Sequence, residues 1–147
     1  VVAYNGIQDR ARLSKVNNDL ENLEKAVHLA RSTSGKVMGQ ITVSNCSRCS
    51  CPYTSGDMTD YSTLPKTNAC WVRYLAVLDA LEAASGANLG GVSNGDPWGA
   101  PYSVDENEGE NAGCGKDALW SFGSSKTMNG GTAVGYRYVP LSGYSGC

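Results

Sequence analysis

The chain has 147 residues and a formal net charge of -2, which argues against a protein whose main task is to bind nucleic acid. The length suits one domain with a single core, and no run of about 18 apolar residues is present to cross a membrane. The 18 glycines, with frequent Ser, Asn and Thr after residue 32, predict turns and short strands in the later chain. We therefore expect one domain over 1–147.

Residues 1–34 are predicted to form a long amphipathic α-helix. Its apolar residues recur at alternating spacings of three and four, which places them on one stripe; they are Leu13, Val16, Leu20, Leu23, Val27 and Ala30. Polar residues are expected on the other faces; they are Lys15, Asn17, Asn18, Asp19, Glu21, Asn22, Glu24 and Lys25. Gly35 suits a left-handed C-cap. Because the pattern runs back through Ile7 without a capping residue, we expect this to be the lower part of a longer helix.

Six cysteines in a small, loop-rich domain predict three disulfides and an oxidising compartment. They are Cys46, Cys49, Cys51, Cys70, Cys114 and Cys147. The alternative is a zinc site at Cys46 and Cys49, which have ligand spacing but lack a second closely spaced pair. The sequence does not choose among the pairings, but Cys147 suggests that the C-terminal tail is joined to the body.

Residues 35–67 are predicted to be a cysteine-rich connecting loop with a short apolar-alternating stretch at 39–43. A second helix is predicted over 68–85, with Asn68 as its N-cap. Its inner face follows helical spacing; it consists of Trp71, Tyr74, Leu75, Leu78 and Leu81. Its outward residues are Arg73, Asp79 and Glu82. We interpret Trp71 and Tyr74 as core contacts, and Cys70 is placed to join this helix to the cysteine loop.

Residues 94–147 are predicted to hold the sheet and the joined tail. Three segments, 101–104, 118–122 and 134–139, combine aromatic or β-branched residues and are separated by turn residues. Consecutive strands with loop connections predict an antiparallel meander. We expect an α+β fold in which this small sheet lies on the apolar stripe of the long helix.

The run Asp-Pro-Trp-Gly-Ala-Pro-Tyr at 96–102 predicts a fixed corner before the first strand. The motif residues are Asp96, Pro97, Trp98, Gly99, Pro101 and Tyr102. In it, Asp96 and Pro97 start the turn, Gly99 relieves it, Pro101 starts the strand and Trp98 fills the gap between sheet and helix. This run resembles a signature of type IV pilin-like proteins, including the pseudopilins of type II secretion. Residues 2–11 are similar to the point where the membrane-spanning half of a pilin helix gives way to its soluble half.

The resemblance implies a structural subunit of an extracellular, cell-surface pilus that serves adhesion, motility or DNA uptake. Its partners would be copies of itself, related pilins and the inner-membrane assembly machinery, and a preceding apolar helix would hold it in the membrane before assembly. It would polymerise through its N-terminal helix, here Asn5, Gly6, Leu13, Val16, Leu20, Leu23 and Val27. Because Gly costs about 1 kcal/mol against Ala in a helix interior, we hypothesise that the helix loosens at Asn5 and Gly6 when the filament forms.

Two alternatives stay open for the function. One is a minor, tip-located pilin that binds a surface or, as the weaker variant, DNA through the cysteine loop and exposed tyrosines. The other is a type II secretion pseudopilin. Pseudopilins often hold calcium where a Ser-x-Gly stretch is followed by aspartates, whereas here Ser121-Phe122-Gly123 is followed by Ser124-Ser125-Lys126. This difference favours a pilus.

No cofactor is required by this reading, but the acidic stretch 105–111 offers oxygen ligands for Ca²⁺ in Asp105, Asn107 and Glu110. The alternative is a solvated charged turn. A G-x-S-x-G pattern stands at 91–95, yet the single histidine, His28, lies upstream on the predicted helix. We therefore predict that the protein is not an enzyme.

Overall fold

The fold is organised around one helix of 33 residues, α1 (Val2–Ser34). The structure is a computed structural model that describes residues 2–52, 59–106, 116–128 and 131–141, with the side chains of 2–5 left aside. The helix ends where predicted, because Gly35 takes a φ of 66° and its N–H donates to the carbonyl of Arg31 at 2.8 Å. Within the described residues, none of the helices combines the length and apolar character that crossing a membrane requires.

Two further helices follow in the chain order, α2 (Met38–Thr42) and α3 (Ala69–Ser85). Helix α3 has the predicted bounds and the predicted N-cap, because the Asn68 side chain accepts from the N–H of Cys70 at 2.9 Å. Gly86 closes the helix at a φ of 72°. Short 3₁₀ turns occupy four places in the described chain; they are η1 (Ser47–Ser50), η2 (Tyr61–Thr63), η3 (Gly90–Val92) and η4 (Gly123–Ser125).

The sheet is the predicted antiparallel meander, in the order β1 (Ser103–Asp105), β2 (Ala118–Phe122), β3 (Tyr136–Pro140). Leu119 at its centre pairs with Val104 on one side and Val139 on the other. The first strand starts two residues later than predicted, at Ser103, where pairing with Trp120 of β2 begins. The last strand starts after Val134, because turns occupy the residues before Tyr136. The α+β class is therefore confirmed.

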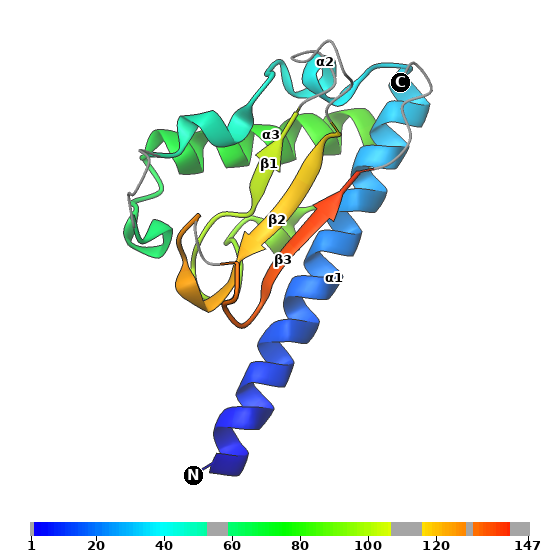
Figure 1. Ribbon diagram of the computed structural model, residues 1–147. Coiled ribbons are helices and arrows are strands. Elements are labelled where there is room, and N and C mark those ends of the chain that lie inside the picture. Colours follow the sequence, from blue (N-terminus) through cyan, green and yellow to red (C-terminus); the bar gives the residue numbers. More distant parts are fainter. Residues whose placement is uncertain (1, 53–58, 107–115, 129–130, 142–147) are drawn as a thin grey trace.

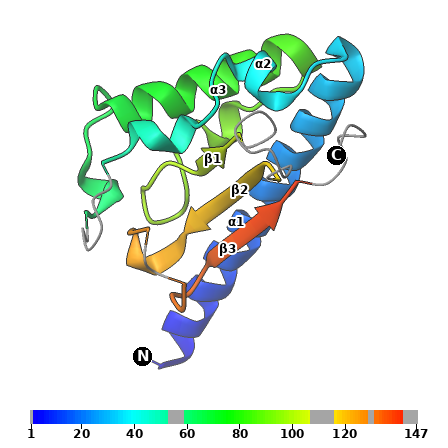
Figure 2. The ribbon, with the colours of Figure 1, turned by 45° about the horizontal axis from the view of Figure 1, so that its top comes forward.

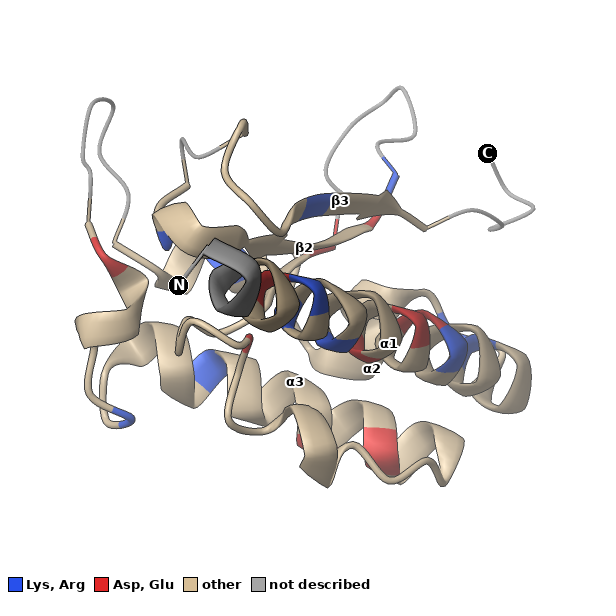
Figure 3. Ribbon diagram, turned by 90° about the horizontal axis from the view of Figure 1, so that it is seen from below, with Lys and Arg blue, Asp and Glu red and all other residues tan. Residues whose placement is uncertain are grey.

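Both α1 and α3 lie on one face of the sheet (Figures 1 and 3). Figure 2 shows the three strands side by side with α1 passing behind them. The main core lies between these layers and includes Leu23 of α1, Leu78 of α3 and Leu119 of β2. Trp71 and Tyr74 belong to it, as predicted. The sheet was expected on the stripe of α1, and α3, which had been given no place there, shares that stripe with it.

The opposite face of the sheet carries a second, smaller core. Successive side chains of a strand point to opposite faces, and residues 118, 120 and 122 of β2 form this cluster with Tyr61 and Ala100. The Tyr61 ring lies 4.8 Å from that of Phe122, and its hydroxyl donates to the carbonyl of Pro52. The cysteine-rich segment thus covers the far face, so β2 is buried on both sides.

Several sequence-based expectations for side chains and local structure were wrong. Leu13 is 37% exposed, since this part of α1 extends past the layers that bury the rest of the stripe. Asp19, expected on a solvent face, is buried. The stretch 39–43 lies mostly within helix α2, in which the Thr42 hydroxyl donates to the Met38 carbonyl. Arg73 is half-buried because it donates to the carbonyl of Thr42 at 2.7 Å.

The structure contains two disulfides in its described part, Cys46–Cys49 and Cys51–Cys70. The second joins α3 to the cysteine loop, as predicted from the place of Cys70. The zinc alternative for Cys46 and Cys49 is wrong in this structure, because the two sulfurs are bonded to each other. Cys114, Cys147 and the predicted third disulfide lie outside the described residues.

Candidate functional site: a projecting helix and the corner that anchors it

Helix α1 has two parts with different surroundings. From Val16 to Arg31 it buries one stripe in the core, and we call 16–31 the anchored half. Every side chain of residues 6–15 is exposed or half-buried, and Ile7 is 66% exposed. Figure 1 shows these first turns running away from the head, and we call 6–15 the projecting half. Gly6 lies within the helix, and a Cβ added there would meet no atom within 4 Å. Asn5 also lies in α1, but its side chain is outside the description.

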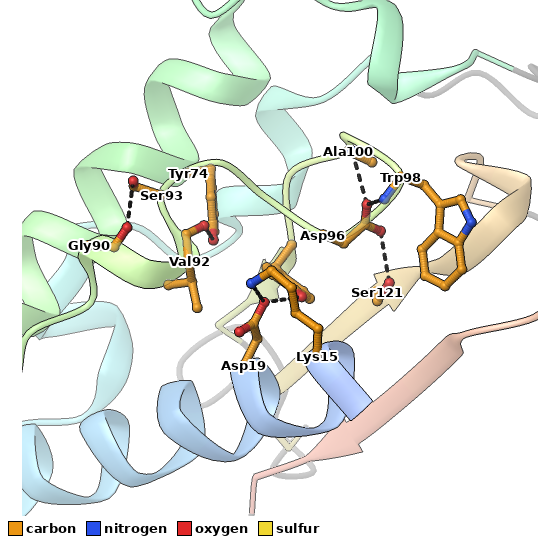
Figure 4. A network of polar contacts seen from close by, with 11 residues as sticks. Lys15, Asp19, Tyr74, Gly90, Val92, Ser93, Asp96, Trp98, Ala100 and Ser121 are labelled. Atoms are coloured by element: carbon orange, nitrogen blue, oxygen red, sulfur yellow. Dashed lines mark hydrogen bonds and ion pairs between the residues drawn. The ribbon is translucent and has the colours of Figure 1, made fainter. Parts of the chain in front are cut away.

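The 96–102 corner is built around the buried carboxylate of Asp96 (Figure 4). One oxygen accepts from the N–H groups of Trp98 and Ala100 at 3.0 and 3.1 Å, and the other accepts from the Ser121 hydroxyl at 2.8 Å. Burial raises the pKa of Asp96, while these hydrogen bonds oppose the rise. The motif Asp therefore holds the turn closed and fastens it to β2.

Two glycines allow the corner to approach its neighbours. Gly95 has a φ of 80°, and a Cβ there would lie 2.2 Å from the carbonyl oxygen of Ala100. Gly135, before β3, would place a Cβ 2.2 Å from the Trp98 ring. The Arg12 guanidinium lies 5.9 Å from the centroid of the same ring. Trp98 thus lies between the β3 turn and α1, as the motif led us to expect.

A second polar contact joins the corner to the anchored half. The Tyr102 hydroxyl donates to a carboxylate oxygen of Asp19 at 2.6 Å. The Lys15 ammonium lies 2.7 Å from the same oxygen (Figure 4). Burial, followed by the contact with Asp19, raises the pKa of Tyr102, which keeps the phenol a neutral donor. Beside it, the Tyr74 hydroxyl donates to the Val92 carbonyl at 2.7 Å and ties α3 to the η3 turn.

A third contact fixes the upper end of α1. The Arg31 guanidinium and the Asp117 carboxylate, 86 residues apart in sequence, meet at 2.5 Å with side chains 8% and 0% exposed. Asp117 immediately precedes β2, and its carbonyl accepts from the N–H of Leu141 at 2.8 Å. The anchored half is therefore fastened near its lower end to the segment before β1 and at its upper end to the segment before β2.

Sequence reasoning missed Asp19 and Arg31 as parts of this anchor. A signal existed, since Asp19 stands three residues after Val16 and Arg31 four after Val27, which places both beside the apolar stripe. The sequence marks Tyr102 as a residue of the corner motif but not as the partner of Asp19, and it does not single out Asp117.

The predicted calcium ligands are only partly within the described chain. Asp105 lies at the end of β1, where its carboxylate pairs with the Arg48 guanidinium at 3.0 Å. Asn107 and Glu110 lie outside the described residues. Among the described side chains, no group of three or more His, Cys, Asp or Glu is placed to hold a metal ion.

The G-x-S-x-G region forms the η3 turn, in which the Ser93 hydroxyl donates to the Gly90 carbonyl at 2.8 Å (Figure 4). A nucleophile elbow instead needs a strand before its serine. His28 lies on α1 beside Glu24, at 3.7 Å. We interpret this pair as an electrostatic contact on the surface of the helix.

Comparison of the chain with protein-family models, with curated proteins and with solved structures returned no match. The functional proposal therefore depends on the residues and geometry of this chain.

Proposed function

We propose that this chain is the head and projecting helix of a structural subunit of an extracellular filament related to type IV pili, polymerising through α1. The observation that carries the proposal is the division of α1. One continuous helix holds an α+β head with residues 16–31 and carries residues 6–15 beyond it. Apolar side chains on such an arm, above all Ile7, become buried when the arm meets a neighbouring subunit.

The anchor between head and helix supports the same proposal. A fibre subunit has to keep its head at a fixed angle to the helix that lies in the fibre, because a loose joint would disorder the lattice. Here Asp19 and Arg31, on opposite ends of the anchored half, bond to the segments that precede β1 and β2. Trp98 lies against Arg12 of α1 and against Gly135 in the turn before β3. The joint is therefore held by side chains from three separate parts of the chain.

The partners in this proposal are further copies of the chain and related pilins along the fibre. Membrane-bound assembly machinery and a preceding apolar helical segment belong to the same proposal. Contacts that repeat head to tail generate an open helical fibre when the rotation between subunits does not close into a ring. The fibre would stand at the cell surface.

The test is immunogold electron microscopy of the organism that encodes the chain, with antibodies raised against the purified 1–147 protein. We expect label along the length of surface fibres. Label at fibre tips alone would replace the main-subunit proposal with the tip-binding alternative. Label that is confined to the cell body would contradict the filament proposal.

A pair of exposed substitutions in the gene makes the test specific to the projecting half. Ile7→Asp changes a side chain on that half, whereas Val134→Asp changes one 47% exposed on the β2–β3 connection. Both proteins should fold, because neither residue lies in the core. We expect fibres to be lost only with Ile7→Asp, and normal fibres from that variant would rule out polymerisation through this surface.

A further inference from the structure

The Cys46–Cys49 disulfide differs from its neighbour in access and in loop length. It links cysteines three residues apart, and Cys49 is exposed while Cys46 is half-buried. The Cys51–Cys70 disulfide spans 19 residues, and Cys70 is 1% exposed in the first turn of α3. A disulfide across a short loop removes less chain entropy from the unfolded state. The Cys46–Cys49 bond is therefore the more accessible of the two and the less needed for stability.

Ser47, between the two cysteines, is held by contacts that do not involve sulfur. Its N–H and its hydroxyl each donate to the carboxylate of Glu106 at 2.6 Å. The Thr42 hydroxyl donates to the same carboxylate at 2.8 Å, and Glu106 is buried. On the other side, Arg73 of α3 donates to the Ser47 hydroxyl at 3.2 Å. Opening the disulfide would leave each of these bonds in place.

Arg48, the other intervening residue, is fixed in the same way. Its Nε lies 3.0 Å from the Asp105 carboxylate, and its guanidinium carbon lies 5.3 Å from the centroid of the Trp120 ring. The segment after Cys49 is held by the Cys51–Cys70 bond. The 46–49 segment is thus attached to β1, β2 and α3 without its own disulfide, and two thiols formed there would stay next to each other.

We propose that Cys46–Cys49 is a thiol-exchange site, at which an external dithiol reduces the disulfide reversibly while the head stays folded. A thiolate of the dithiol attacks the exposed Cys49 sulfur, the Cys46–Cys49 bond breaks, and Cys46 leaves as a thiolate that takes a proton from water. The second thiolate of the dithiol then attacks the first dithiol sulfur, which is bonded to Cys49 in the mixed disulfide. Cys49 leaves as a thiolate and is protonated. The dithiol loses two electrons and becomes a disulfide, while Cys46 and Cys49 gain them.

The site is independent of the filament proposal, because the contacts named above are with Glu106, β1, β2 and α3 rather than with the projecting half of α1. The probe is dithiothreitol, added in increasing concentration to the folded, oxidised protein, followed by acid quenching, alkylation and peptide mapping. Trypsin cleaves after Arg48, so Cys46 and Cys49 fall on different peptides. We expect Cys46 and Cys49 to be alkylated at dithiothreitol concentrations at least about tenfold below those that open Cys51–Cys70. The circular dichroism spectrum should stay unchanged, and oxidised dithiothreitol should restore the bond.

Joint opening of both disulfides, prior opening of Cys51–Cys70, or loss of the spectrum on reduction of Cys46–Cys49 would each overturn the proposal. A matched pair of double variants separates a reactive bond from a structural one. Cys46→Ser with Cys49→Ser should leave the urea midpoint of unfolding unchanged, whereas Cys51→Ser with Cys70→Ser should lower it or prevent folding. If the first pair lowers the midpoint as far as the second, Cys46–Cys49 is a structural bond and the exchange site is refuted.

Discussion

The two halves of α1 share one pattern of apolar residues but differ in how much of it is buried. Leu13 and Leu20 stand on one helical stripe, yet Leu13 is 37% exposed and Leu20 is 1% exposed. The difference comes from the length of the layers that α1 meets, because the sheet and α3 cover residues 16–31 and stop short of the projecting half. Figure 3 shows charges spread along α1, and the pair of Arg12 and Asp9 at 3.8 Å lies at the surface of the projecting half. Helical periodicity thus identifies a face that can be buried, and the tertiary structure decides how much of that face is buried.

The largest effect should come from breaking the buried ion pair in the anchored half. Asp117→Ala removes one partner of Arg31 and leaves a buried guanidinium without that carboxylate, which typically costs about 3–5 kcal/mol of unfolding free energy. The control is Glu21→Ala, which removes the exposed partner of Lys25 and should cost about 1 kcal/mol or less. Urea unfolding measures both. Equal losses of unfolding free energy would mean that the buried pair at the upper end of α1 contributes no more to stability than an exposed pair.

A smaller effect should separate two leucines on the same stripe. Leu23→Ala empties a site in the core and should cost about 2–5 kcal/mol. Leu13→Ala changes an exposed side chain of the projecting half and should alter the unfolding free energy by about 0.5 kcal/mol or less. The comparison uses thermal and urea unfolding of both variants. A large loss for Leu13→Ala would show that the projecting half is packed in solution.

The smallest effect concerns the projecting half alone. Gly6→Ala places a methyl group in open space, so it should stabilise the first turns of α1 locally by about 1 kcal/mol through helix propensity. Amide hydrogen exchange around residue 6 should slow several-fold, with no change in global unfolding, since these turns open independently of the head. In cells, the variant tests whether the helix must loosen at Asn5 and Gly6 for fibres to form. Normal fibre assembly would remove that hypothesis.

Much of the local structure was predictable because it depends on neighbours in sequence. The C-cap Gly35 and the N-cap Asn68 act within one turn of their own helices, and both were predicted correctly. The β2 segment was also found with its observed bounds, since turn residues surround its aromatic residues Trp120 and Phe122. Helix α2 was missed because five residues are too few to display a helical period.

The candidate site was predictable only in part. The 96–102 corner is a local turn, so its residues signal their own geometry, and Asp96 has the role of turn holder that its position indicates. The same carboxylate also accepts from Ser121, which no local rule suggests. Glu106 bonds to the cysteine segment through Ser47. In the sequence it belongs to the acidic stretch 105–111, which was interpreted either as a source of calcium ligands or as a solvated charged turn. Its burial depends on donors from Thr42 and Ser47, about sixty residues away.

By itself, the sequence determined the two long helices, the order of the strands and the face of α1 that can be buried, because backbone capping, turn geometry and hydrophobic periodicity act over a few residues. The tertiary structure alone decided that Asp19 and Arg31 are buried, that Cys51 pairs with Cys70, and that α1 divides into an anchored and a projecting half. An ionised side chain becomes stable in the interior only where a partner from a distant segment meets it, and the place of that partner is a property of the whole fold.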